Sequence, residues 1–209
     1  MKRVVLVAAF AVMLAGVASA DTVDFSFIGG TITLAGSALS GSSTLIAVTA
    51  LPGGNGVIAP SPSGFGTVTF TTGDLTSGSL LAGGTFGPGG IVTIFSSTIN
   101  AVIYTGVFSG TTNWIPNGTS SYTLTGPLTG AISSNLAGFL FGCPTCTGTS
   151  SGALTTLTIT GSYPFSSPAG ISSGNINTNV TPIPEPASML LFGTGLTGLA
   201  ALIRRRRKQ

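Results

Sequence analysis

Hydrophobic and polar residues alternate in short runs through the middle of the chain, and this pattern predicts β-strands. β-Branched and aromatic residues recur at every second position, and clusters of Gly, Pro, Asn or Ser separate one run from the next. No window between the two ends of the chain has the apolar period of a helix. The predicted strands are Val23 to Ile28, Thr31 to Ala35, Leu45 to Ala50, Gly66 to Thr72, Gly90 to Phe95, Asn100 to Phe108, Ser121 to Thr125, Leu128 to Ser133 and Leu154 to Thr160.

Short strands in this number predict an all-β fold. We expect a single antiparallel β-sandwich or jelly-roll-like domain over residues 21–161, large enough to bury a core between two sheets. A β-solenoid is the alternative, disfavoured because the sequence has no fixed repeat. The Gly/Pro-rich composition of residues 52–64 and 83–90 predicts two long loops. Residues 162–183, rich in Pro, Ser and Asn, predict a flexible linker, with allowance for one short strand near 170–180.

The N-terminus has the three parts of a secretory signal peptide. Two basic residues precede an apolar run over residues 4–14, and Ala18 and Ala20 form a small-residue cleavage site. We therefore expect residues 1–20 to pass through the Sec translocon and to be removed by signal peptidase, so that the mature chain begins at Asp21. A retained N-terminal membrane helix is the alternative.

The C-terminus, residues 184–209, combines a short motif, an apolar segment and a basic cluster. Pro184, Glu185 and Pro186 precede residues 187–203, which carry no charge and reach ~26 Å as a helix, close to the thickness of a bilayer core. This predicts one transmembrane helix rather than a buried core helix. The cations that follow it favour the cytoplasmic side, which leaves the body of the protein outside. They are Arg204, Arg205, Arg206, Arg207 and Lys208.

These residues, in this order at the end of the chain, resemble the PEP-CTERM sorting signal of exported proteins in Gram-negative bacteria. The resemblance covers only the tail and the export signal. It implies an exosortase as partner, with Glu185 as the recognition residue, and it implies a membrane-anchored intermediate that later reaches the cell surface, the outer membrane or the extracellular matrix. The two flanking prolines would hold the carboxylate of Glu185 in an extended segment just above the membrane.

Charge is concentrated at the two ends of the chain. All seven basic residues lie in the two terminal segments, and the chain has no His. The body carries only Asp21, Asp24 and Asp74, a net charge of −3. Without cations it lacks the main driving force for binding phosphates, so nucleic acid is excluded as a partner.

Cys143 and Cys146 form the one conspicuous local motif of the body, Cys-Pro-Thr-Cys. A metal site would need further Cys or His ligands, which the chain lacks, so we expect neither a metal nor a cofactor. A redox pair would need a helix N-terminus, whereas Gly and Ser/Thr flank the motif. Export to an oxidising compartment favours a local disulfide between the two cysteines.

The sequence offers few side chains that could catalyse a reaction. A serine hydrolase needs a base beside its nucleophile, and a glycosidase needs two facing carboxyls. Asp21 and Asp24 lie at the mature N-terminus, and Asp74 follows Gly73 in a turn-like stretch. We therefore expect no enzyme.

Threonine recurs at alternate positions in several predicted strands. One interpretation is an ordered hydroxyl face that binds ice or a polysaccharide. The simpler one is that Thr is an uncharged β-former suited to the solvent side of a half-buried strand. The pairs and triplets are Thr31 and Thr33, Thr67 and Thr69, Thr123 and Thr125, and Thr156, Thr158 and Thr160.

The sequence thus predicts an exported, C-terminally sorted surface or matrix protein with a structural or adhesive role, associated with exopolysaccharide or biofilm. The alternative is a carbohydrate-binding module. In that case Trp114, the only Trp, would stack on a glycan, and it would be exposed together with Tyr104 and Tyr122 on one sheet face. A core or edge aromatic is the simpler interpretation of Trp114.

Overall fold

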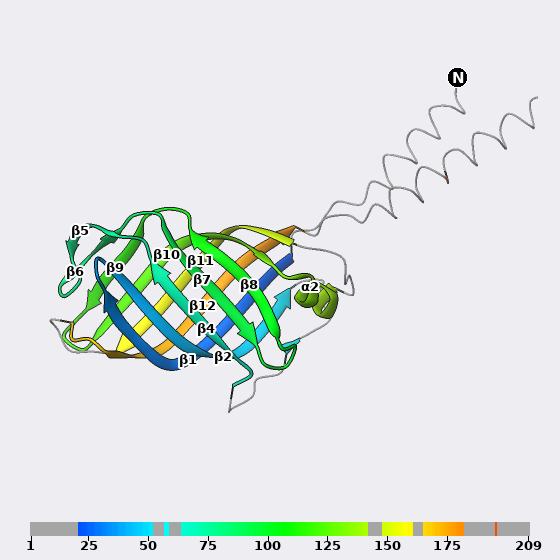
Figure 1. The fold of residues 1–209 in the computed structure, drawn as a ribbon, viewed down its shortest axis with the longest axis horizontal. Helices are drawn as coiled ribbons and strands as arrows, with labels where there is room; N and C mark the ends of the chain where they lie inside the picture. The colour runs from blue at the N-terminus through cyan, green and yellow to red at the C-terminus, as the bar shows by residue number, and fades with distance from the viewer. Residues whose placement is uncertain are drawn as a thin grey trace, which may run out of the picture.

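Antiparallel strands make up most of the protein (Figure 1). The structure, a computed structural model, describes residues 21–51, 57–58, 64–141, 148–160 and 165–181, together with Gly195. Its elements are β1 (Asp21–Ala35), β2 (Ala38–Leu51), β3 (Val57–Ile58), β4 (Gly66–Thr72), β5 (Leu75–Ser79), β6 (Gly83–Phe86), β7 (Gly89–Ser96), β8 (Ala101–Phe108), β9 (Thr112–Asn117), β10 (Ser121–Ile132), α2 (Ser134–Phe141), β11 (Gly148–Thr160) and β12 (Ala169–Thr181).

All twelve strands belong to one sheet, and that sheet closes on itself. Neighbouring strands follow the order β11, β12, β1, β2, β4, β7, β8, β10, and β10 pairs with β11 to complete the circuit. The result is the cylinder of tilted strands in Figure 1. The all-β prediction is confirmed, but the two-sheet sandwich is wrong. Alternation requires one buried face, and a sheet rolled around its own core provides it as well as two facing sheets do. The antiparallel, closed path also differs from a β-solenoid.

Strand β10 is the point where the sheet divides. One edge of β10 pairs with β11, while the other pairs with β9 over Ser121–Thr125 and with β8 over Leu128–Ile132. From β9 the sheet continues through β6 to β5. Residues 83–90, predicted to be a loop, therefore contain β6 and the start of β7.

The inward side chains fill the cylinder with hydrophobic and aromatic groups. Most of the longer strands bury alternate residues, as the predicted alternation requires; in β10, for example, Tyr122, Leu124 and Leu128 are buried. Strand β5 buries none of its residues. Fully burying one large apolar side chain contributes about 1.5–3 kcal/mol. The fully buried set includes Trp114, Tyr104, Tyr122, Phe25, Phe27, Phe86, Phe108, Ile32, Leu39, Leu45, Ile94 and Ile103.

Two inward glycines make room for aromatic rings. Gly41 on β2 lies opposite Phe70 on β4, and a Cβ atom at Gly41 would overlap the Phe70 ring. On β8, a Cβ atom at Gly106 would likewise overlap the ring of Tyr104, which lies on the same strand. Each ring occupies the space that a side chain at the glycine would need.

A short helix, α2, lies at one end of the cylinder (Figure 1). Its Leu136, Ala137 and Leu140 are buried, and the hydroxyl of Ser133 accepts a hydrogen bond from the Leu136 amide at 3.2 Å, as an N-cap does. The expectation that the body has no helical segment is wrong. A segment of eight residues that is apolar on most sides gives too short a pattern to show a helical period.

Strand β12 lies within the stretch that the sequence assigns to a linker, at the place where one short strand near 170–180 is allowed for. It is 13 residues long, and it pairs with β1 on one side and with β11 on the other. Its outward positions carry Asn and Ser, which is why its composition is typical of a spacer. The folded unit therefore extends to Thr181 and not only to residue 161.

Candidate functional site

The outer face of the cylinder carries hydroxyl side chains in register across neighbouring strands. Thr31 of β1 lies opposite Ser42 of β2, and Ser42 lies opposite Thr69 of β4. The row continues through Thr93 on β7 to Thr105 on β8. Neighbouring strands are ~4.8 Å apart, so five hydroxyls follow one another across five strands.

A second row runs beside the first, two residues further along each strand. It contains Thr33, Ser40 and Thr71 on β1, β2 and β4, and it ends at Ile91 on β7. Residues two apart on a strand are ~6.7 Å apart. The two rows therefore form a grid of hydroxyls over three strands.

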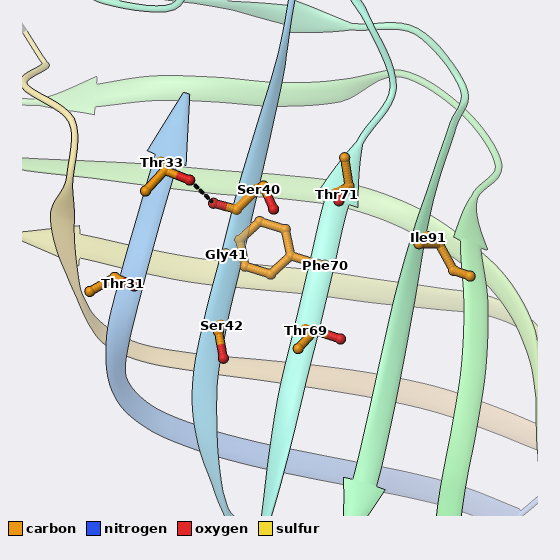
Figure 2. A pocket seen from close by; sticks show the side chains of 9 residues that line it. All are labelled: Thr31, Thr33, Ser40, Gly41, Ser42, Thr69, Phe70, Thr71 and Ile91. Carbon is orange, nitrogen blue, oxygen red and sulfur yellow. Dashed lines mark hydrogen bonds between the residues drawn. The ribbon is translucent and has the colours of Figure 1, made fainter. Parts of the chain in front are cut away.

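A shallow depression of about 290 Å³ lies over this grid (Figure 2). The middle strand, β2, carries serines, whereas both flanking strands carry the larger threonines, so the surface is lowest along β2. We call this depression the hydroxyl groove. Its lining residues are Thr31, Thr33, Ser40, Gly41, Ser42, Thr69, Phe70, Thr71 and Ile91.

Most hydroxyls of the groove have no hydrogen-bond partner among the described residues. Thr33 donates to the carbonyl of Ser40 at 3.4 Å, and Thr69 to the carbonyl of Thr93 at 3.5 Å, both long contacts. Within the part of the chain that the structure describes, the side chains of Ser42 and Thr71 make no hydrogen bond, and the same holds for Thr31 and for the Ser40 hydroxyl. These groups are free to donate to and accept from a ligand.

The sequence predicted part of this surface. Thr31, Thr33 and Thr69 were identified by their alternation, but Ser40 and Ser42 were not. The alignment across strands depends on the pairing register, which alternation within one strand does not give.

A second depression, of about 330 Å³, lies over β11, β12, β1 and β2. Ser26, Ile28 and Ser173 are among its lining residues. Beside it, the Asn175 side-chain amide donates to the Asp24 carboxylate. Burial raises the pKa of Asp24 above its usual value, and the hydrogen bond from Asn175 opposes this shift.

Trp114 belongs to the core. It is 1% exposed and stacks on Tyr122 with ring centroids 4.5 Å apart, while Phe165 meets both rings edge-on. Its Nε1–H donates to the carbonyl of Leu80 at 3.0 Å. Tyr104 and Tyr122 are fully buried as well, so none of these three faces is open to a sugar.

Asp74 fits the role of a turn residue. It is exposed, its carboxylate accepts a hydrogen bond from the Ser37 hydroxyl, and its carbonyl accepts one from the amide of Gly87 at 2.9 Å. In the described part of the chain, no three His, Cys, Asp or Glu side chains come together where they could hold a metal ion.

Several predicted sites fall outside the described residues. These are the signal-cleavage residues Ala18 and Ala20, the pair Cys143 and Cys146, the motif Pro184, Glu185 and Pro186, and the basic cluster 204–208. Of the predicted membrane segment 187–203, only Gly195 is described. Among the described residues no helix is long and apolar enough to cross a membrane.

Comparison with known proteins identifies the C-terminus. The family model of the PEP-CTERM protein-sorting motif matches residues 182–207, which confirms the resemblance seen in the sequence. The motif is that of an exported protein held transiently in the membrane and processed by an exosortase. No curated protein and no solved structure matches the chain.

Proposed function

We propose that this chain, which carries a PEP-CTERM protein-sorting motif at residues 182–207, is a non-enzymatic surface or extracellular-matrix protein. After export and C-terminal sorting, its β-domain serves as a structural or adhesive component in contact with exopolysaccharide.

One observation supports this proposal above the others: a closed sheet around a hydrophobic core carries rows of hydroxyl side chains, and no basic residue, on its outer face. The interior is occupied by apolar and aromatic groups. The outer grid of Thr and Ser is suited to hydrogen bonding with water and with sugars. A rigid domain with such a surface fits a hydrated matrix of polysaccharide.

The carboxylates support a role without catalysis. Asp24 is held by Asn175 on the outer face, and Asp74 is held by Ser37 beside a turn. The chain has no His that could serve as a general base. The burial of Trp114 argues against the version of a carbohydrate-binding module that relies on aromatic stacking.

The test is the mass and the cellular fraction of the mature protein in the native host, with and without its exosortase. We expect wild-type protein in the surface or matrix fraction, shortened at both ends, and protein that keeps its C-terminal segment in the membrane fraction of the exosortase-deficient strain. We also expect the matrix-located protein to sediment with exopolysaccharide.

Glu185→Ala should reproduce the exosortase-deficient result, because it removes the only carboxylate of the tail. Asp74→Asn, which removes a carboxylate from the body, is the matched control and should sort normally. Identical mass and distribution for Glu185→Ala and wild type would contradict the sorting role of Glu185. Mature protein that stays free of the polysaccharide would contradict the matrix role.

A further inference from the structure

We infer that the hydroxyl groove binds a neutral polysaccharide, with one glycan chain lying along β2. This rests on the proposed function and names the class of ligand and the surface that takes it.

The chemistry of the groove fits a neutral sugar. Ser42 and Thr71 offer hydroxyls without partners in the described part of the chain, and each hydroxyl both donates and accepts. Sugar hydroxyls have the same dual capacity. Ile91, which is 48% exposed at one side of the groove, gives the C–H groups of a sugar ring an apolar contact.

The charge of the protein selects a neutral glycan over an acidic one. Uronate, sulfate or phosphate groups need cations, and no Lys or Arg lies between Arg3 and Arg204. The three carboxylates of the body give it a net charge of −3, which repels an anionic chain. An uncharged polymer needs no cation from the protein and is not repelled by its carboxylates.

The geometry favours a linear polymer. A closed sheet curves across its strands, so the hydroxyl rows do not lie in one plane, and a flat ice lattice would meet only part of them. The groove covers Ser40, Gly41 and Ser42 of β2, and residues of β1 on one side and of β4 and β7 on the other line it. At about 290 Å³ it is near the lower limit for enclosed ligand sites (~300 Å³), so a bound chain lies along it and continues past both ends.

The floor of the groove is held rigid from below. The Phe70 ring of β4 packs under Gly41 of β2, and both residues line the groove (Figure 2). Because this contact fixes β2 against β4, the hydroxyls of Ser40, Ser42 and Thr69 keep their spacing before a ligand arrives. Such preorganisation lowers the entropic cost of binding.

The experiment is affinity electrophoresis of the exported protein through gels that contain hydroxyethylcellulose, dextran or galactomannan, all neutral, or carboxymethylcellulose. The cellulose derivatives share one backbone and differ in charge. We expect retardation by at least one neutral polymer and none by carboxymethylcellulose. The double substitution Ser40→Ile and Ser42→Ile fills the groove with good strand formers and should weaken binding roughly tenfold.

Thr71→Val removes one groove hydroxyl that has no partner among the described residues, with little change of shape, and should weaken binding roughly fivefold. Thr129→Val, an exposed position on β10 outside the groove, is the matched control and should bind as wild type does. Thermal unfolding verifies that each variant is folded, and Thr71→Val alone tests the inference if the double variant does not fold.

Three outcomes would overturn the inference: no retardation by any of the neutral polymers, equal retardation by carboxymethylcellulose, or wild-type binding by the folded groove variants. Sorting and matrix location are measured separately in cells. A failure of groove binding is therefore distinguishable from a failure of the proposed function.

Discussion

At the scale of single residues, Trp114 shows how the indole N–H of a buried aromatic side chain finds a hydrogen-bond acceptor inside the cylinder. The ring stacks on Tyr122 and meets the edge of Phe165, and its Nε1–H reaches the carbonyl of Leu80. The Tyr122 hydroxyl donates to the carbonyl of Leu81 at 2.9 Å. Together these contacts fix the turn between β5 and β6 over the aromatic cluster.

Trp114→Ala should destabilise the fold by about 3–5 kcal/mol, because it leaves a large cavity and removes the stacking partner of Tyr122. Urea denaturation of the purified protein measures this loss. The neighbouring Ile115, which is exposed, is the matched control, and Ile115→Ala should change stability by no more than about 0.5 kcal/mol. Equal, small losses for both variants would show that Trp114 is not a core residue.

Asp24 gives the stability an unusual dependence on pH. Burial raises its pKa in the folded state above the usual 3.8, so from pH 3.8 up to the raised pKa the folded protein binds more protons than the unfolded one. Stability contributed by this group is therefore highest below pH 3.8 and falls as the pH rises through that window. Asp24→Asn should lack this decline. Denaturant titrations of both proteins at several pH values check it, and parallel curves would exclude Asp24 as the cause.

At the scale of elements, the contact between β2 and β4 depends on a missing side chain. A Cβ atom at Gly41 would overlap the Phe70 ring, which is buried. Gly41→Val should therefore cost at least about 1–3 kcal/mol, the usual cost of overpacking, although Val is a better strand former than Gly.

Gly170 on β12 is the matched control for Gly41, because a Cβ atom there meets nothing within 4 Å. Gly170→Val should leave stability nearly unchanged or raise it slightly. Thermal or urea unfolding compares the two variants. A Gly41→Val protein as stable as the Gly170→Val protein would mean that β2 and β4 can separate to admit the side chain.

The elements also show how much of the fold can be predicted from the sequence. β4 was predicted with its observed bounds, because Val68 and Phe70 alternate with polar residues between glycine-rich ends. β12 was mostly assigned to a linker, because Ile171 and Ile176 are the only large apolar residues buried among its described positions, beside the small Ala169 and the polar Thr178. The closure between β10 and β11 pairs residues that lie from 16 (Ile132 and Gly148) to 39 (Ser121 and Thr160) positions apart in the chain, and no pattern within one strand specifies that register.

The candidate surface was predictable to a similar extent. Alternating threonines indicated which side of each strand faces solvent, because an exposed β-strand position favours an uncharged β-former. The groove itself exists because β2 carries Ser40 and Ser42 between taller neighbours on two other strands. That relation joins Ser40 and Ser42 to β1 residues 7 and 11 positions away and to β4 residues 31 and 27 positions away, and only the folded sheet reveals it.

At the scale of the whole molecule, closure protects the sheet. The strands that form the cylinder pair on both sides, so their backbone groups are not available for pairing with other chains. This suits a protein with little charge repulsion between its copies, since the body carries only three charged side chains. A surface protein at high local concentration can thereby avoid edge-to-edge aggregation.

The distribution of charge makes processing visible as a change of isoelectric point. The whole chain has an isoelectric point near 9.2, because its seven basic residues outnumber its four acidic ones. Removal of residues 1–20 leaves five basic side chains against four acidic ones, still an excess of positive charge. Removal of the C-terminal segment beyond Pro186 leaves no basic side chain at all.

We therefore expect two-dimensional electrophoresis to show a basic species in the membrane fraction and an acidic species in the surface or matrix fraction of wild-type cells. In cells without the exosortase only the basic species should appear, since signal peptidase alone does not remove the basic cluster at residues 204–208. Replacing that cluster by glutamines is the control, because the membrane form should then focus at acidic pH without any cleavage. A surface form of the wild-type protein that still focuses at basic pH would show that the cluster travels with the domain, and that the motif at residues 182–207 acts here as a permanent anchor.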